Sequence, residues 1–315
     1  MALGPGTSEI TPSIVDPPRL PVRVETVRRQ FDVRVARWPR HEAVVREVGR
    51  RLIERLDLMR LAPRLVADVG AGGGAARTAL MGKFPQSRWL GLDLSAAMLA
   101  SGRKAGWSGR LAAWAGSSPW LVCAEAGQLP LPAGAVDLVH SNLMLHWHPA
   151  PHTLFVEWAR VLGTDGLLLF SAFGPDTLKE LRAAMAEAWP AARPVSFVDM
   201  HDYGDMMVAA GLATPVMDVE TLTLTYASAD ALISEARALG ANPRDDRPDG
   251  LPGGAAGRRL REALTRRAGA DGRIALSFEV VYGHAWKPAP RVRGQTAVTL
   301  EALRAELGAR KKAPS

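Results

Sequence analysis

The sequence has little cysteine and no long apolar run, and both absences exclude classes of protein. Cys123 is the only cysteine among 315 residues, so the chain forms no intramolecular disulfide, and a cysteine-based metal site is disfavoured. No stretch approaches the roughly 20 apolar residues of a membrane-spanning helix. The opening residues have neither the apolar core of a signal peptide nor the arginine-rich, acid-poor pattern of a transit peptide. We therefore expect a cytoplasmic protein with no membrane partner and no metal site.

Aromatic residues are also scarce, at 6% of the sequence, and they show no pattern that would stack single-stranded nucleic acid. Basic residues are abundant, and the net charge at pH 7 is +7. Such a charge favours an acidic partner, whereas arginines on the solvent-exposed face of a helix would give the same composition. Both interpretations stay open, and nucleic acid is the disfavoured partner.

Short apolar runs alternate with helical stretches along most of the chain. Residues 41–59 repeat apolar side chains every four positions between arginines, as in an amphipathic helix. Strands that alternate with helices predict an α/β fold with a parallel sheet covered on both faces, and with ligands at the carboxyl ends of the strands. Two long alternating strands, at 216–226 and 273–286, predict an antiparallel pair at the edge of that sheet.

Three segments follow from this pattern. We expect residues 1–24 to be a disordered lead, because they contain several prolines and no periodic apolar pattern. We expect residues 25–290 to form one domain with N-terminal lid helices. We expect residues 291–315 to be a basic C-terminal tail that includes the run RKK.

The stretch LVADVGAGGGAARTAL, residues 65–80, is an apolar strand that ends at an acid and passes through glycines into a helix. Two ligand-binding patterns fit it. The dinucleotide fingerprint is met by Gly70, Gly72 and Ala75, with Asp93 as the later acid. The pattern D-x-G-x-G-x-G, the first motif of class I methyltransferases that use S-adenosylmethionine, is met by Asp68, Gly70, Gly72 and Gly74.

The charge of Asp68 favours the second pattern. A pyrophosphate at a helix start binds to backbone N–H groups and to the positive end of the helix dipole, so a neighbouring carboxylate opposes it. S-adenosylmethionine carries an ammonium and a sulfonium, both cations, and an acid beside it is favourable. Asp93 fits either ligand, because an ionised carboxylate accepts hydrogen bonds from both ribose hydroxyls.

The segment CAEAGQLPLPAGAVDLVHSNLMLHW, residues 123–147, resembles the methyltransferase superfamily from the end of the third strand through the fourth. The resemblance implies that Glu125 meets the adenine of the donor, at a position where the superfamily usually has aspartate. It also implies that the backbone of Ala126 and the side chain of Leu94 lie beside the adenine ring. Asn142 and Leu143 would then flank the methionine part of the donor.

His146, near the end of that segment, is a candidate catalytic base. The alternative, which we favour, is that His146 and Trp147 are a packing element at the start of the next helix. The spacing of the neighbouring histidines matches no metal site.

Further segments narrow the resemblance to one family, and FGPDTLKELR at 173–182 is the most specific of them. With QFDVRVARW, which contains Phe31, they resemble the malonyl-acyl-carrier-protein O-methyltransferases of biotin synthesis over roughly residues 28–287. This resemblance implies a Rossmann-like class I methyltransferase fold with a seven-stranded sheet. It also implies methyl transfer from S-adenosylmethionine to the free carboxylate of a malonyl thioester on an acyl carrier protein.

Such chemistry needs no general base, because a malonyl carboxylate is already ionised at neutral pH. The rate should come from positioning and from removing water around the nucleophile. Arginine suits a carboxylate, and Arg182 lies on one helix face with Lys179. We hypothesise that Arg182 helps to hold the malonyl group, the alternative being an ordinary exposed charge. Tyr203 and Tyr226 are lesser candidates.

Acyl carrier proteins are small and acidic, so the basic helix at 41–59 would steer their docking, less strongly as salt rises. Two departures from the family stand out: Trp38 where tyrosine is common, and Glu125 in place of aspartate. Three alternatives therefore remain. They are methylation of another acceptor, whether a small molecule or a protein, oxidation as in the related arginine hydroxylases of respiratory complex I assembly, and non-catalytic binding of RNA or protein.

Overall fold

The computed structural model describes residues 17–36, 38, 42–102, 120–240, 243, 244, 246 and 254–289. The α-helices are α1 (Val24–Arg34), α2 (Ala43–Glu54), α3 (Arg77–Lys83), α4 (Ala96–Gly102), α6 (Pro151–Val161), α7 (Lys179–Ala188), α8 (Met200–Ala209), α9 (Ala229–Gly240) and α10 (Gly254–Thr265). The 3-10 helices are η2 (Arg55–Leu58) and η3 (Leu145–Trp147). The strands are β1 (Leu65–Val69), β2 (Arg88–Asp93), β3 (Trp120–Cys123), β4 (Val136–Asn142), β5 (Leu162–Phe173), β6 (Ala213–Tyr226) and β7 (Ile274–Trp286).

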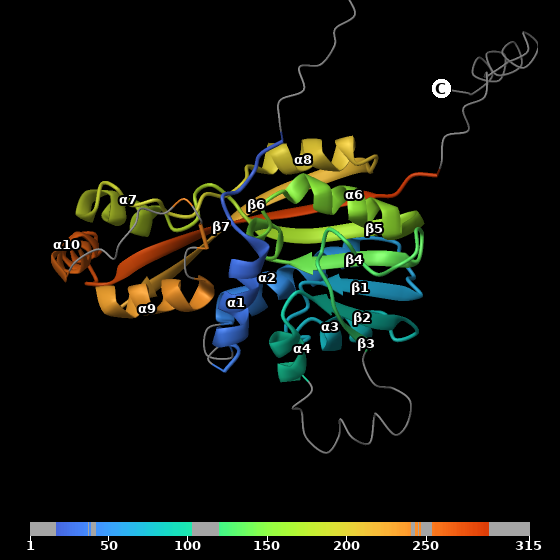
Figure 1. Cartoon of the computed structure of the whole chain (residues 1–315), viewed down its shortest axis with the longest axis horizontal. Coiled ribbons are helices and arrows are strands. Elements are labelled where there is room, and N and C mark those ends of the chain that lie inside the picture. The colour runs from blue at the N-terminus through green and yellow to red at the C-terminus, as the bar shows by residue number, and fades with distance from the viewer. Residues whose placement is uncertain are drawn as a thin grey trace, which may run out of the picture.

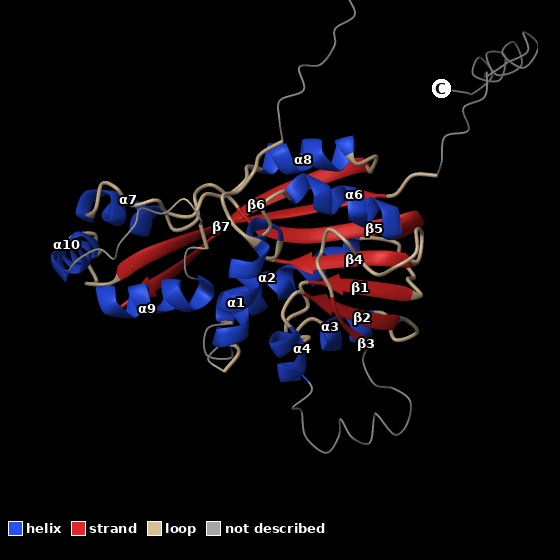
Figure 2. Ribbon diagram, in the orientation of Figure 1, coloured by secondary structure: helices blue, strands red, loops and turns tan. Residues whose placement is uncertain are grey.

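The strands form one seven-stranded sheet in the order β3-β2-β1-β4-β5-β7-β6 (Figure 2). The first five strands pair in parallel. The last strand among the described residues, β7, runs antiparallel to both of its neighbours, β5 and β6. The predicted α/β sheet with an antiparallel pair at its edge is confirmed. The insertion of β7 between β5 and β6 is a detail that the periodicity did not indicate.

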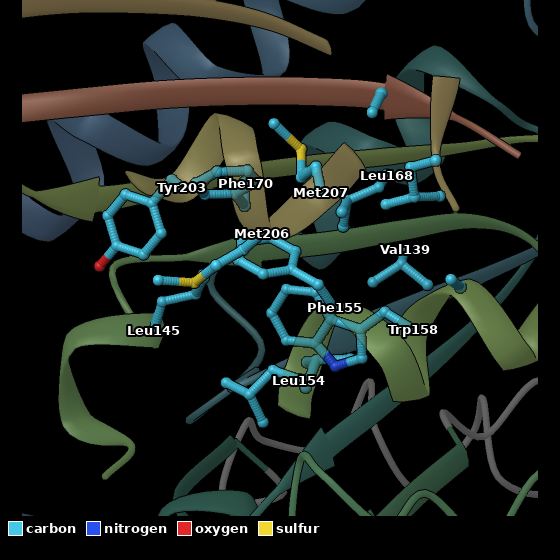
Figure 3. Packing of buried hydrophobic residues seen from close by; sticks show 14 of the residues in the cluster. Val139, Leu145, Leu154, Phe155, Trp158, Leu168, Phe170, Tyr203, Met206 and Met207 are labelled. Atoms are coloured by element: carbon cyan, nitrogen blue, oxygen red, sulfur yellow. The ribbon is translucent and has the colours of Figure 1, made fainter. Parts of the chain in front are cut away.

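Helices cover both faces of the sheet, because successive residues of its buried strands point to opposite sides. In β1, Val66 packs with the residues of α2 and α3. Its neighbour Ala67 packs with the residues of α6 and α8 on the other face. Figure 3 shows this second cluster, in which the rings of Phe155 and Phe170 lie 5.4 Å apart, edge to face. Packing on both faces holds the sheet rigid, including the carboxyl edge of its parallel strands.

The strands β6 and β7 extend well past the carboxyl ends of the parallel strands (Figure 1). Helices α7, α9 and α10 gather on this extension, and α1 lies between it and α4. The edge of the sheet where β1 and β4 end is therefore enclosed by helices from both halves of the chain. This arrangement creates the space in which the candidate site lies.

Residues that precede the boundary predicted at residue 24 pack against the rest of the fold. Leu20 and Val22 are buried in the core, and the backbone N–H of Leu20 donates a hydrogen bond of 2.8 Å to the carbonyl of Pro149. The predicted disordered lead is therefore wrong for residues 17–24, because these two apolar side chains find partners too distant in sequence for a local pattern to reveal. Residues 1–16 and the predicted tail at 291–315 lie outside the described residues. Within the described ranges no helix has the length and apolarity needed to cross a membrane.

Candidate functional site

A cavity of about 340 Å³ lies at the carboxyl ends of β1, β2 and β4, and we call it the donor cavity. Residues of helices α1, α2 and α4 contribute to its wall. It is lined by most of the predicted donor-binding residues, namely Phe31, Asp68, Gly70, Gly72, Asp93, Leu94, Glu125, Ala126, Asn142 and Leu143, and also by His146. Gly74 and Arg182, also predicted site residues, are not on its wall.

The glycine loop after β1 has a backbone that other residues adopt at a cost. Gly70, Gly72 and Gly74 have φ values of +80°, +53° and +79°. A Cβ atom on Gly70 would lie 2.7 Å from Cγ of Met144, closer than carbon atoms pack. A Cβ atom on Gly74 would make only ordinary contact with the ring of Trp89, at 3.4 Å. Glycine is thus favoured at Gly70 by both the close approach and the positive φ, and at Gly74 by the positive φ alone.

Asp68, at the end of β1, is a buried carboxylate with one oxygen free. Its Oδ1 lies 2.8 Å from Nδ1 of His140, which is fully buried in β4 and paired with Asp68 in the strand register. Its Oδ2 is buried and has no hydrogen-bond partner among the described residues. A buried anion with an open acceptor is costly unless a ligand completes it. His140 lies inside a mostly buried strand, an unusual position for histidine that could have marked it as a site residue.

Asp93, at the end of β2, is held by backbone donors. Its Oδ2 accepts from the N–H of Gly72 and its Oδ1 from the N–H of Ser95, both at 2.8 Å. Burial raises the pKa of Asp93, and the nearby carboxylates of Asp68 and Asp32 add to the effect. Each carboxylate oxygen keeps a second acceptor position, as the predicted ribose contacts require.

A hydroxyl ties the lid helix α1 to this strand end. Ser95 Oγ donates to Oδ1 of Asp32 in α1 at 2.5 Å, while its own N–H binds Asp93. Sequence reasoning missed both Ser95 and Asp32, because the contact joins residues 63 positions apart. The bond holds Phe31 over the cavity, where its ring lies edge to face against Trp38 at 5.6 Å and Trp147 at 5.4 Å.

Glu125 and Ala126 follow β3 at the predicted adenine end of the cavity. Glu125 Oε2 accepts from the N–H of Gly127 at 2.9 Å, and its Oε1 lies 3.1 Å from Nε2 of His148. The hydrogen bond from His148 is the main reason that the pKa of Glu125 lies below its usual value. The carbonyl of Ala126 accepts from the indole N–H of Trp158 at 3.1 Å. This end of the cavity is thus fixed by the α6 core.

Asn142 ends β4, Leu143 follows it, and the two residues join the strand to two other elements. Asn142 Nδ2 donates to the carbonyl of Val45 in α2 at 2.9 Å, and its Oδ1 accepts from the hydroxyl of Ser171 in β5 at 2.7 Å. Leu143 has a φ of +52°, in the left-handed region that glycine favours. Its N–H donates to both the carbonyl and the hydroxyl of Ser171, which stabilise this turn.

His146 is buried in an aromatic wall at the far end of the donor cavity. Its ring centroid lies 5.0 Å from that of Trp147, 4.8 Å from that of Phe173 and 5.7 Å from that of Phe197. Burial lowers the pKa of His146 to about 3, so the imidazole is neutral at pH 7 and a weak base. The geometry favours the packing interpretation over the catalytic one.

Arg182 lies on the wall of a second cavity, of about 380 Å³, between α7, α9 and α10. Its guanidinium donates to the carbonyl of Pro175. Phe197 lines this second cavity and contacts His146 and Phe173 of the first, so its ring separates the two. Tyr203, a lesser candidate, is fully buried in the α8 core and takes no part in either cavity. In the ranges that the structure describes, no three His, Cys, Asp or Glu side chains are grouped to hold a metal.

Known proteins are similar to this chain in sequence and in fold. A methyltransferase-domain model matches residues 67–170. The malonyl-(acyl-carrier protein) O-methyltransferase of Laribacter hongkongensis is 45% identical over 269 residues, which cover 85% of this chain and 90% of that protein. The protein of the same name from Gallionella capsiferriformans is 40% identical, with 88% and 95% covered. This chain belongs to the malonyl-(acyl-carrier protein) O-methyltransferase family.

Solved structures agree on the fold of this family member. The YcgJ protein from Bacillus subtilis has a TM-score of 0.52 at 17% identity and covers 78% of this chain and 99% of its own. A chain from the Haloferax volcanii complex that contains the Trm112 methyltransferase activator has a TM-score of 0.51 at 19% identity, with 85% and 100% covered. The Rossmann-like class I methyltransferase fold is confirmed, and with it the methyltransferase pattern over the dinucleotide pattern.

The donor cavity of this methyltransferase fits S-adenosylmethionine, the donor of the class. The Oδ2 of Asp68, which is buried without a partner, would accept a cationic group and would oppose a pyrophosphate. Asp93 would hold the ribose, and Glu125 with Leu94 the adenine. Asn142 and Leu143 would flank the methionine part.

Gly70→Ala should weaken donor binding, because the added methyl collides with Met144 and the backbone keeps a φ of +80°. A cost of about 1–3 kcal/mol corresponds to an affinity for S-adenosylhomocysteine that falls about 5- to 150-fold. Gly82→Ala is the matched control, since that position in α3 has open space around it. Calorimetry on both variants measures the effect, and an unchanged Kd in Gly70→Ala would contradict this role of the loop.

His146 should make the stability of the fold depend on pH. The unfolded chain binds a proton near the ordinary pKa of 6.5, whereas the folded chain binds it only near 3. The free energy of unfolding therefore decreases as pH falls from about 6.5 toward 3, by at most about 1.4 kcal/mol per pH unit from this group. In His146→Phe, denaturant unfolding at several pH values should show a shallower dependence, and equal slopes would show that His146 is not buried in this way.

Proposed function

We propose that this chain transfers a methyl group from S-adenosylmethionine to the free carboxylate of the malonyl group on malonyl-acyl carrier protein, a step of biotin synthesis. The observation that carries the proposal is the identity of 45% to a protein of that name, over 90% of its length. The donor cavity supports it, because its free buried carboxylate suits a cationic donor. Malonyl-acyl carrier protein is thus the proposed partner.

The residues of the donor cavity position the two substrates and exclude water. When bound, S-adenosylmethionine supplies a methyl group on a positively charged sulfur. The malonyl carboxylate is ionised at neutral pH, so no residue has to remove a proton, which agrees with a neutral His146. Phe31, Trp38 and Trp147 exclude water from the cavity, and a carboxylate stripped of water is a better nucleophile.

The acceptor carboxylate needs a cation near the donor cavity. We hypothesised that Arg182 provides it, but that side chain lines the second cavity and donates to Pro175. Arg28 and Arg46 are the arginines on the wall of the donor cavity, and Arg46 pairs with Glu42 at 2.9 Å. The proposal therefore assigns first contact with the carboxylate to Arg28, and a more remote role to Arg182.

Steering by the helix at 41–59 receives less support than its composition indicated. Arginines of α2 and η2 pair with carboxylates: Arg50 with Glu47 and Glu54, Arg51 with Glu47 and Glu220, and Arg55 with Asp218. Paired charges attract an acidic partner weakly. The proposed partner is still an acidic carrier protein, in the cytoplasm, where fatty-acid enzymes elongate the ester. The basic surface that contacts it would lie outside the helix at 41–59.

The test is transfer of labelled methyl from S-adenosylmethionine to malonyl-acyl carrier protein, beside the acetyl form that lacks the free carboxylate. We expect label on the malonyl form alone, released by mild base as a methyl ester is. Label on both forms would exclude the carboxylate as the acceptor. No label on either, from protein that binds the donor, would favour the hydroxylase, other-acceptor or non-catalytic alternatives.

A further inference from the structure

A third cavity, of about 310 Å³, lies between the end of α1 and helices α9 and α10, and we call it the arginine groove. Its lining residues are Arg34, Trp38, Asp230, Ile233, Ser234, Arg237, Ala238 and Arg261. Three of them are arginines and one is an acid. Nothing in the methyl-transfer chemistry above uses this groove.

Two of the three guanidinium groups have no counter-ion in the groove. Asp230 pairs with Arg261 at 2.7 Å, which accounts for the one acid. Arg34 Nη1 is buried without a hydrogen-bond partner, and its Nη2 reaches only Gln30, at 3.4 Å. Arg237 is exposed and has no hydrogen-bond or ion-pair partner among the described residues. Because a buried donor without a partner is unfavourable, an anionic ligand would stabilise Arg34, and Arg237 would add a second unpaired positive charge.

The arginine groove adjoins the donor cavity. Trp38 lines both, so the two spaces meet at its indole ring. Helix α9 also borders both, through Ala238 on the groove and Leu239 on the donor cavity. A ligand whose anionic end lies among the arginines would therefore extend past Trp38 toward the methyl donor.

We propose that the arginine groove binds the phosphate of the prosthetic arm that carries the malonyl group. This inference rests on the proposed function, in which the acceptor is a carrier-protein thioester. The arm of such a carrier joins a serine of the protein to the thioester through a phosphodiester, so it has an anion at one end and the reacting acyl group at the other. Arginine binds phosphate oxygens through several N–H donors at once.

The size of the groove favours one phosphate over a longer polyanion. RNA would require a basic track with bases stacked on aromatic rings, and the groove offers one tryptophan. Binding of the arm would also account for the position of the groove beside the donor cavity, whereas binding of free phosphate would not.

Arg237→Gln and Arg34→Gln test the site, and Arg258→Gln is the matched control. Arg258 is an exposed arginine of α10 that does not line the groove, so its loss changes the net charge equally. Each groove variant should raise the KM for malonyl-acyl carrier protein about tenfold, the value of one charge-assisted hydrogen bond, with little change in kcat or in the KM for S-adenosylmethionine. With malonyl-pantetheine, which lacks the phosphate, KM should stay unchanged.

The outcomes separate this inference from the proposed function. An equal rise in KM in Arg258→Gln would mean general attraction between charges and would overturn the site. A rise with malonyl-pantetheine as large as with the carrier protein, or no rise in either groove variant, would overturn it while the methyltransferase activity stands. No methyl transfer to malonyl-acyl carrier protein by the wild type would overturn the proposed function itself, and this inference with it.

Discussion

A buried carboxylate with one free oxygen is the constraint on which the site depends. Asp68 is almost fully removed from water, and His140 satisfies only one of its oxygens. The pairing follows from the parallel register of β1 and β4, which places the two residues side by side. Burying an anion in this way is unfavourable without a ligand of opposite charge. A donor with two cationic groups supplies that charge, and a dinucleotide does not.

The surrounding residues position this carboxylate and shape the cavity in front of it. They do not prepare a proton transfer. Gly70 gives the loop after β1 its turn and leaves room for Met144, and Ser95 ties α1 to the end of β2. The aromatic wall around His146 keeps the imidazole neutral. An acceptor that arrives already ionised needs such a site, because orientation and removal of water are the terms left to the protein.

The sequence predicted the parts of the site that depend on short segments. Asp68, Gly70 and Asp93 lie where a strand ends in a turn, so the local motif also predicts their position in the fold. Arg182 illustrates the opposite case, because helix periodicity defined its face but not the cavity that the face meets. His140 depends on strand register, and the arginine groove depends on α1 meeting α9, about 200 residues later in the chain. Local patterns do not contain these long-range contacts.

The affinity of Asp68→Asn for S-adenosylmethionine, measured by calorimetry, tests the central claim most directly. The amide keeps the shape of the side chain and a hydrogen-bonding oxygen for His140, and it removes the negative charge. Because a hydrogen bond to a charged group contributes about 1.5–3 kcal/mol, the account predicts a Kd that rises about tenfold or more in a variant that is folded and no less stable. An unchanged Kd would show that the buried carboxylate does not bind the donor, and would contradict the account.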